Sequence, residues 1–139
     1  MGYSVLIVDD SASMRKIVRK VLKMSGFDVS ECLEAGHGIE ALQVLERHPI
    51  DVVLTDLNMP EMNGIEFMRA LRKDERWQDL PVVLITTEAR KEYIKEAIFL
   101  GARGYLRKPF KPEAVRVLLT DIMGEVNHEM AGNDDGCDF

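Results

Sequence analysis

Short runs of Val, Ile and Leu recur along the chain, and they constrain its fold more than any other feature. Four runs stand out, at Val5–Val8, Val52–Leu54, Val82–Ile85 and Tyr105–Leu106. A fifth, at Val29–Leu33, alternates between apolar and polar residues, as an edge strand does. Continuous apolar runs suit strands that are covered on both faces, which is the situation in a parallel sheet. The pattern therefore predicts five strands in a mostly parallel sheet.

Amphipathic helical stretches separate these runs. In the first, apolar residues recur at helical spacing from Met14 to Leu22, and it has Ser11 or Ser13 as its N-cap and Gly26 at its end. The other predicted helices are Ile39–Leu45, Ile65–Leu71, Tyr93–Leu100 and Ala114–Ile122. Successive βα units predict a doubly wound α/β domain with helices on both faces of the sheet.

Length and composition fit a single domain. The chain has 139 residues, of which 46% are hydrophobic, and this is enough to bury a core. Residues 1–124 form the expected domain, and residues 125–139, rich in Gly, Asn and Asp, are predicted to be a disordered acidic tail. The apolar runs are shorter than the ~20 residues that span a bilayer. The start of the chain does not match a secretory signal, and there are only two cysteines, so we expect a cytoplasmic protein.

Polar residues follow four of the apolar runs. They are Asp9 and Asp10, Thr55 and Asp56, Thr86 and Thr87, and Arg107 and Lys108. In an open parallel sheet, ligands bind outside the carboxyl ends of the strands. An aspartate after one strand is commonly a helix cap or a turn residue, but that explanation does not account for polar residues at four strand ends. The pattern predicts a functional site at this edge of the sheet.

The residue types at this edge point to phosphoryl transfer. Carboxylates at close range repel one another unless a cation compensates their charge, and Mg²⁺ is a cation that prefers carboxylate oxygens. A carboxylate beside Mg²⁺ can act as a nucleophile toward phosphorus. A lysine ammonium and a threonine hydroxyl can then hold the phosphoryl oxygens. The net charge of −6 argues against general binding to nucleic acid, whose backbone is also negative.

Four segments resemble the receiver domains of bacterial two-component response regulators. They are LIVDDS at Leu6–Ser11, LTDLNMPEMNG at Leu54–Gly64, LITTEA at Leu84–Ala89 and GYLRKPF at Gly104–Phe110. The resemblance covers about residues 3 to 123, and within the family it is greatest to the stand-alone chemotaxis regulators. It implies a flavodoxin-like fold, a five-stranded parallel sheet in the order 2-1-3-4-5.

The resemblance also implies how the acidic residues act. Asp56 matches the phosphoacceptor. Asp10 and Asp56 match direct ligands of Mg²⁺, or of Mn²⁺ in its place, and Asp9 matches a residue that acts through metal-bound water. Asn58 matches the position whose backbone carbonyl completes the metal site.

Further positions match the switch and its tuning. Thr86 and Tyr105 match the switch residues, and Lys108 matches the lysine that contacts the phosphoryl group, with a cis peptide bond between Lys108 and Pro109. Asn58, Thr87 and Glu88 match positions that modulate the lifetime of the phosphoryl group. Thr87 departs from the family, which usually has Ala or Gly there.

The implied function is a phosphorylation switch that is not an enzyme for other substrates, although it catalyses its own phosphorylation and dephosphorylation. A histidine kinase is the expected phosphodonor, and a flagellar motor-switch protein or a phosphatase is the expected further partner. The expected contact surface is Arg90–Leu100, Arg103–Leu106 and Pro112–Ile122. We expect a monomer that binds neither nucleic acid nor membrane.

Two alternatives remain open at this point. One is a phosphoryl shuttle or sink in a multistep relay. The other is a haloacid dehalogenase-like phosphohydrolase, which would need Asp-x-Asp after the first strand and a cap insertion. The basic face of the first helix, with Arg15, Arg19 and Lys23, is either a kinase contact or a solvated surface.

Overall fold

Helices and strands alternate along the chain in the computed structural model, which describes residues 2–87 and 90–131. The strands are β1 (Tyr3–Val8), β2 (Val29–Ala35), β3 (Val52–Thr55), β4 (Val82–Thr86) and β5 (Ala102–Arg107). The helices are α1 (Ala12–Ser25), α2 (Gly38–Arg47), α3 (Gly64–Lys73), α4 (Lys91–Phe99) and α5 (Pro112–Ala131). Each predicted element is present, and most extend one to three residues beyond the predicted bounds.

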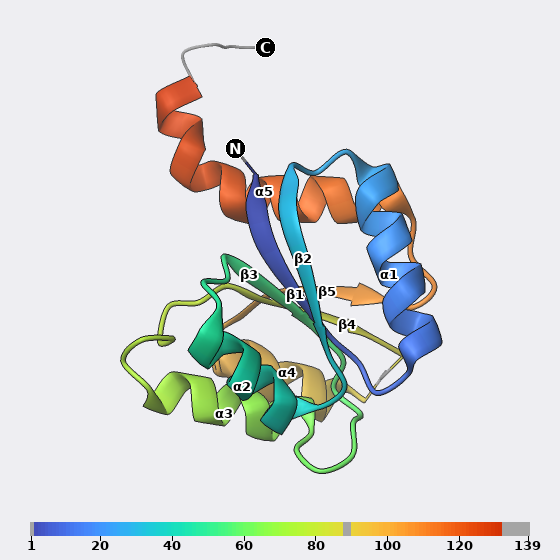
Figure 1. The fold of residues 1–139 in the computed structure, drawn as a ribbon, viewed down its shortest axis with the longest axis vertical. Coiled ribbons are helices and arrows are strands. Elements are labelled where there is room, and N and C mark those ends of the chain that lie inside the picture. The colour runs from blue at the N-terminus through green and yellow to red at the C-terminus, as the bar shows by residue number, and fades with distance from the viewer. Residues whose placement is uncertain (1, 88–89, 132–139) are drawn as a thin grey trace.

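The strands form one parallel sheet in the order β2-β1-β3-β4-β5, which confirms the predicted order (Figure 1). Val8 at the end of β1 lies opposite Ala35 on one side and Thr55 on the other. The carboxyl ends of β1, β2 and β3 therefore lie level at one edge of the sheet. Residues that directly follow these strands are neighbours in space, although they are far apart in the sequence.

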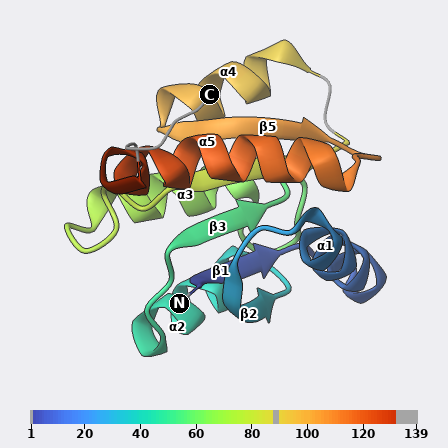
Figure 2. The ribbon, with the colours of Figure 1, turned by 90° about the horizontal axis from the view of Figure 1, so that it is seen from above.

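Helices cover both faces of the sheet, as predicted for a doubly wound domain (Figure 2). Side chains alternate between the two faces along each strand. Leu6, Val53 and Leu84 pack with residues of α2, α3 and α4 in one core cluster. Val5 and Val52 face the other way and pack with residues of α1 and α5. Strands covered on both sides explain the continuous apolar runs in the sequence.

Local signals set the ends of the helices. Ser11, rather than Ser13, is the N-cap of α1, and its side chain accepts a hydrogen bond from the Met14 amide. Gly26 ends this helix in the left-handed region, at φ 82°. Asn63 caps α3 in a capping box with Glu66, which fixes where α3 begins beside the predicted acceptor loop.

Helix α5 is longer than the sequence pattern indicates. It runs to Ala131 and therefore includes the first seven residues of the segment predicted to be a tail. Gly124 costs only about 1 kcal/mol inside a helix, and no Gly or Pro follows it up to Ala131. Residues 132–139 lie outside the described residues. No helix in the described part of the chain is long and apolar enough to cross a bilayer.

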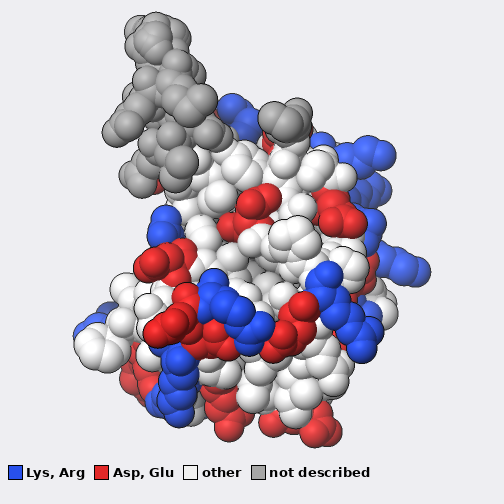
Figure 3. All heavy atoms as spheres, turned by 60° about the vertical axis from the view of Figure 1, so that its left-hand side comes forward, with Lys and Arg blue, Asp and Glu red and all other residues white. Residues whose placement is uncertain are grey.

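Acidic and basic side chains are interspersed on the surface. They lie beside one another in a band across the face shown in Figure 3. Arg76, for example, binds both Asp74 and Glu46 at 2.7 Å. Its hydrogen bonds lower the pKa of Asp74 to about 2. This mixed face does not resemble the basic surfaces that bind a phosphate backbone.

Arg72, on α3, joins three segments at the opposite edge of the sheet from the acidic residues. Its guanidinium donates to five backbone carbonyls, namely those of Leu100 (2.7 Å), Trp77 (2.9 Å), Gln78 (3.1 Å), Leu80 (3.2 Å) and Gly101 (3.4 Å). Desolvation lowers the pKa of this guanidinium. The side chain therefore holds α3, the loop before β4 and the loop before β5 together.

We expect Arg72→Met to lower the free energy of unfolding by about 2–4 kcal/mol, because partly buried carbonyls would lose a charged donor. Urea unfolding followed by circular dichroism measures this loss. Arg69→Met, one turn earlier on α3, is the control. Arg69 pairs with Glu96 at the surface, and such a pair contributes about 0–1 kcal/mol. Equal losses in the two variants would contradict the role given to Arg72.

Candidate functional site

Three aspartates that are distant in the sequence meet at the carboxyl edge of the sheet. Asp9 and Asp10 follow β1, and Asp56 follows β3. The Asp56 amide donates to the carbonyl of Val8 at 2.9 Å, so sheet hydrogen bonding continues up to the site. One carboxylate oxygen of each aspartate lies within 4.8 Å of those of the other two. Asp9 and Asp56 are buried, and Asp10 is exposed.

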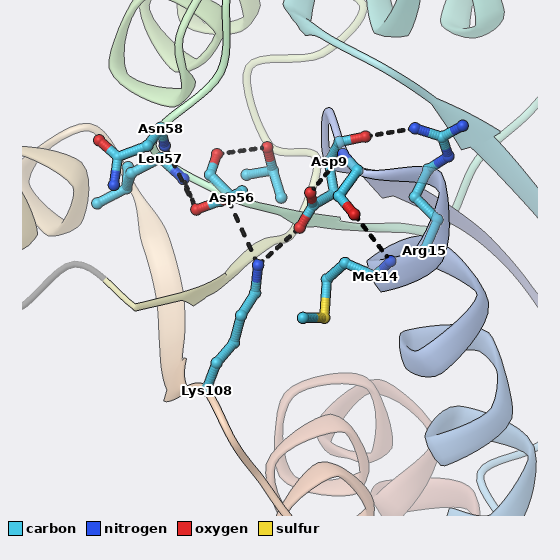
Figure 4. A network of polar contacts seen from close by, with 9 residues as sticks. Asp9, Met14, Arg15, Asp56, Leu57, Asn58 and Lys108 are labelled. Atoms are coloured by element: carbon cyan, nitrogen blue, oxygen red, sulfur yellow. Dashed lines mark hydrogen bonds and ion pairs between the residues drawn. The ribbon is translucent and has the colours of Figure 1, made fainter.

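Lys108 reaches this cluster from the end of β5 (Figure 4). Its Nζ donates to Asp9 Oδ2 at 2.7 Å and to Asp56 Oδ2 at 3.4 Å. The Lys108 side chain is 9% exposed, so solvent screens these contacts weakly. One ammonium among three carboxylates leaves two formal negative charges. Such an arrangement attracts a divalent cation.

Backbone amides fix the orientation of Asp56. Its Oδ1 accepts hydrogen bonds from the amides of Leu57 at 2.7 Å and Asn58 at 3.3 Å, and its Oδ2 faces Lys108 (Figure 4). The Thr55 hydroxyl donates to the Asp56 carbonyl at 2.9 Å. The Asp56 carboxylate is therefore held in one orientation before any ligand binds.

Asp9 and Asp10 differ in their surroundings. Asp9 Oδ1 accepts a hydrogen bond from the Ser11 amide at 2.9 Å, and Oδ2 is bound by Lys108. The carboxylate of Asp10 is exposed at the edge of the cluster. This difference fits a metal site in which Asp10 binds an ion directly and Asp9 acts through water.

The donor set fits a hard cation. Mg²⁺ and Mn²⁺ prefer carboxylate and carbonyl oxygens, and they suit sites that combine one or two carboxylates with several waters. Asp10 and Asp56 supply carboxylate oxygens within 4.8 Å of each other, and the exposed loop residue Asn58 directly follows Leu57 beside them. The cluster could therefore hold Mg²⁺.

Gly64 sets how closely α3 approaches the acceptor loop. Its amide donates to the Leu57 carbonyl at 2.9 Å. A Cβ atom at this position would lie 2.5 Å from the Asp56 carbonyl oxygen and 2.8 Å from Leu57 Cα. Backbone atoms cannot move aside cheaply, so only glycine fits here. The sequence segment Leu54–Gly64 contains this glycine, but its role follows only from the distances.

Thr86 and Tyr105 emerge on the same face of the sheet. Thr86 lies opposite Arg107 in the β4–β5 pair, and Leu84 lies opposite Tyr105. Thr86 is fully buried, and Tyr105 is half-buried against the core cluster shared with α4. The Lys108 amide donates to the Thr86 carbonyl at 3.0 Å. The two predicted switch residues are thus neighbours along adjacent strands.

Thr87 and the peptide bond between Lys108 and Pro109 are two further predicted features, and both adjoin Lys108. Thr87 is exposed and lines an apolar cavity of about 310 Å³ together with Met14, Ile17, Lys108 and Phe110. The peptide bond between Lys108 and Pro109 is cis. Glu88 lies outside the described residues.

Arg15 and Arg19 lie on the basic face of α1, where Arg15 is half-buried and Arg19 is exposed. Both bind the carboxylate of Glu34 on β2, at 2.9 Å each. Arg15 also donates to the carbonyl of Asp9. The sequence indicates a basic helix face here, but not that it is connected to the acidic cluster.

Comparison with known proteins assigns the family. Residues 5–120 match the response regulator receiver domain, and the chain therefore belongs to the response regulator receiver domain family. A chemotaxis protein CheY homolog from Campylobacter jejuni is 38% identical over 128 residues, which cover 91% of this chain and 97% of the relative. Chemotaxis protein CheY from Pseudomonas aeruginosa is 41% identical over 123 residues, which cover 88% of this chain and 98% of the relative.

Solved structures agree with this assignment. Chemotaxis response regulator CheY4 of Vibrio cholerae is 37% identical, with a TM-score of 0.73 and coverage of 89% of this chain and 98% of that one. The receiver domain of a sensor histidine kinase from Pseudomonas aeruginosa is 25% identical, with a TM-score of 0.77, and the match covers 89% of this chain and 99% of that one. That structure has a magnesium ion coordinated in its active-site cleft. The chain is a CheY-like response regulator receiver domain.

We expect Asp10→Asn to stabilise the metal-free protein by about 1 kcal/mol, because it removes one of three mutually repelling charges in partly screened surroundings. Saturating Mg²⁺ should abolish or reverse this advantage, because the wild type gains stability by binding the ion. Urea unfolding with a chelator and with Mg²⁺ measures both effects. The control Asp121→Asn changes an exposed aspartate outside the cluster. A metal-free Asp10→Asn protein less stable than the wild type would contradict the repulsion.

Proposed function

We propose that the chain is a phosphorylation switch of chemotaxis signalling. A histidine kinase donates a phosphoryl group to Asp56 in a Mg²⁺-dependent reaction, and the phosphorylated protein binds a flagellar motor-switch protein. The observation that carries the proposal is the Asp56 carboxylate, oriented by two backbone amides and facing the Lys108 ammonium within the acidic cluster. The CheY relatives support chemotaxis as the pathway. A cytoplasmic location and a monomeric state are part of the proposal.

Phosphoryl transfer to Asp56 requires mainly positioning and charge compensation from the protein. A carboxylate oxygen of Asp56 forms a bond to phosphorus as the bond from phosphorus to the imidazole nitrogen of the donor breaks, and the imidazole leaves with a proton. Lys108 would compensate charge on the phosphoryl oxygens, and its contacts with Asp9 at 2.7 Å and Asp56 at 3.4 Å support this role. A bound Mg²⁺ or Mn²⁺ supplies further charge compensation.

The metal would be held by Asp10, Asp56 and the Asn58 carbonyl, with Asp9 acting through water. Attack of water on phosphorus releases phosphate and restores Asp56, so the chain catalyses both its own phosphorylation and its own dephosphorylation. The exposed residues Asn58 and Thr87 would modulate access for this water; Glu88, which matches a third modulating position in the sequence, lies outside the described residues. Thr87 narrows the approach more than the Ala or Gly usual in the family.

Phosphorylation would act on the sheet through Thr86 and Tyr105. A phosphoryl group on Asp56 offers strong acceptor oxygens that attract the Thr86 hydroxyl. Movement of Thr86 opens space on the face of the sheet that it shares with Tyr105, and Tyr105 fills that space. Two packings that differ by a few kcal/mol are enough for such a population shift.

The surface formed by α4, β5 and α5 would report the switch to a partner. A groove of about 1040 Å³ runs between β5 and α5, and its lining includes Tyr105, Phe110 and Val117. Val117 is 58% exposed, and Phe99 at the end of α4 is 89% exposed. Apolar side chains on this surface suit a protein partner.

We expect Asp56→Asn to abolish phosphorylation, because an amide oxygen is a far weaker nucleophile than a carboxylate. Incubation with acetyl phosphate and Mg²⁺, followed by intact-mass measurement, detects the added phosphoryl group. Asp121→Asn, which removes an exposed aspartate on α5, should be phosphorylated like the wild type. Phosphorylation of Asp56→Asn would disprove the assignment of the acceptor.

We expect Thr86→Ala to separate phosphorylation from output. Beryllofluoride with Mg²⁺ should tighten binding of a flagellar motor-switch peptide to the wild type about ten-fold, which corresponds to about 1.4 kcal/mol. Thr86→Ala should still take up beryllofluoride but lose this tightening, whereas the control Thr87→Ala should keep it. Tightening retained in Thr86→Ala would contradict the switch.

The same titration distinguishes the alternative output. If the wild type binds beryllofluoride but shows no affinity for the peptide in either state, the chain would instead be a phosphoryl shuttle or sink in a relay. Transfer of the phosphoryl group from Asp56 to a histidine phosphotransfer domain would then be the positive observation. The acceptor chemistry is common to both outputs, so Asp56→Asn tests it independently.

A further inference from the structure

The side chain of Arg15 links the acidic cluster to the edge strand of the sheet. Arg15 lies one turn inside α1, and its side chain points back toward the start of the helix, as helical side chains do. Its Nη1 donates to the carbonyl oxygen of Asp9 at 2.5 Å (Figure 4). Its Nε donates to Glu34 Oε1 at 2.9 Å. The side chain is 19% exposed. The proposed function assigns no role to this residue.

The contact with Asp9 completes the hydrogen bonding of that residue. The Asp9 amide donates to the Ala35 carbonyl at 3.1 Å, and its two carboxylate oxygens accept from Ser11 and Lys108. Arg15 binds the carbonyl oxygen. Asp9 is thus held at its amide, its side chain and its carbonyl.

The carbonyl of Asp9 belongs to the same planar peptide group as the amide nitrogen of Asp10. Fixing the direction of this carbonyl fixes the plane of the peptide, and with it the position from which the Asp10 side chain leaves the backbone. Asp10 is exposed, so it lacks the packing that holds Asp9 and Asp56. The hydrogen bond from Arg15 therefore restrains the peptide group that carries the Asp10 Cα, which is the point from which the Asp10 carboxylate extends.

Glu34 holds Arg15 in the orientation that this contact needs. Glu34 lies on β2 opposite Ile7 of β1, next to the pair formed by Ala35 and Val8. Its second carboxylate oxygen is bound by Arg19, which also donates to the Cys32 carbonyl at 2.9 Å. The planar guanidinium of Arg15 can reach the strand and the loop at once because its donors diverge.

We propose that Arg15 is a positioning residue of the metal site, which orients the Asp10 carboxylate for Mg²⁺ through the Asp9 carbonyl. The proposal rests on the proposed function only in that the acidic cluster binds Mg²⁺. Residues that orient metal ligands without touching the metal typically change metal affinity by about 10–100-fold when they are replaced.

Charge alone predicts the opposite effect. Arg15 carries a positive charge near the cluster, so its removal would strengthen Mg²⁺ binding if repulsion between the two cations were its main influence. Loss of the hydrogen bond to Asp9 would weaken binding. The direction of the change in Arg15→Met therefore separates positioning from charge.

Mg²⁺ affinity is measured by isothermal titration calorimetry on the full chain, without a phosphodonor. We expect Arg15→Met to weaken Mg²⁺ binding at least ten-fold. Arg15→Lys keeps the positive charge but lacks the planar, diverging donors of the guanidinium. It should weaken Mg²⁺ binding by a smaller factor than Arg15→Met does. The matched control is Arg19→Met, which removes an arginine from the same glutamate without touching Asp9, and it should stay within about two-fold of the wild type.

A second measurement guards against a general loss of structure. Phosphorylation by acetyl phosphate is followed at increasing Mg²⁺. In Arg15→Met and Arg15→Lys, the half-saturating Mg²⁺ concentration should rise, and the rate at saturating Mg²⁺ should return to near the wild-type value. A misfolded site would not recover at high Mg²⁺, and such a result would count against a positioning role.

The outcomes separate this inference from the proposed function. If the wild type itself fails to bind Mg²⁺, the metal site in the proposed function is wrong. If the wild type binds Mg²⁺ and Arg15→Met binds it equally well or more tightly, the metal site stands and the positioning role of Arg15 is overturned. Weakening of equal size in Arg19→Met would also overturn it, because the effect would then come from Glu34 and not from the contact with Asp9.

Discussion

Repulsion among Asp9, Asp10 and Asp56 is the constraint on which the site depends. Three carboxylates with oxygens within 4.8 Å of one another would separate in a flexible loop. Here they do not separate, because each follows an element whose position is set by the core. Lys108 offsets only part of the charge. The remaining negative charge is the physical basis on which the proposed cation site and phosphoryl acceptor rest.

The parallel sheet provides the rigidity that this arrangement needs. The strands β1 and β3 are buried on both faces, so neither can shift without breaking contacts in both core clusters. Hydrogen bonds from Asp9 to Ala35 and from Asp56 to Val8 extend the sheet to the site itself. The close approach of α3 at Gly64 then fixes the loop after Asp56. Stability of the fold and geometry of the site therefore come from the same contacts.

Features with a strong local signal could be predicted from the sequence. The apolar runs indicate buried strands, and polar residues at strand ends indicate the site, because parallel strands all end at one edge. Asp9, Asp10, Asp56 and Lys108 could be named for this reason, and the order of the strands followed from the family resemblance. The N-cap of α1 could be narrowed to Ser11 or Ser13, and the choice between them depends on backbone geometry.

Contacts between distant segments could not be predicted. Arg72 looks like any basic residue at the end of a helix, yet it binds carbonyls of two loops that only the fold brings together. The same is true of Arg15, whose partner Glu34 lies on another element. Helix α5 also runs beyond the end that the sequence indicates, because Gly124 and the polar residues after it suggest a helix end at a place where the helix continues. Local composition does not report such long-range or cooperative effects.

Strand β5 connects the chemistry of the site to the surface that a partner would contact. Lys108 follows this strand directly, and Tyr105 lies within it, on the face of the sheet that Thr86 shares. The Lys108 amide donates a hydrogen bond to the Thr86 carbonyl, which holds the ends of β4 and β5 together. A phosphoryl group on Asp56 would interact with the side chains of both Thr86 and Lys108 at this point. In the proposed switch, a change at Asp56 would reach Tyr105 through two adjacent strands, by local repacking of Thr86 and Tyr105. Because Tyr105 also lines the groove between β5 and α5, the path from the acceptor to the exposed surface is short.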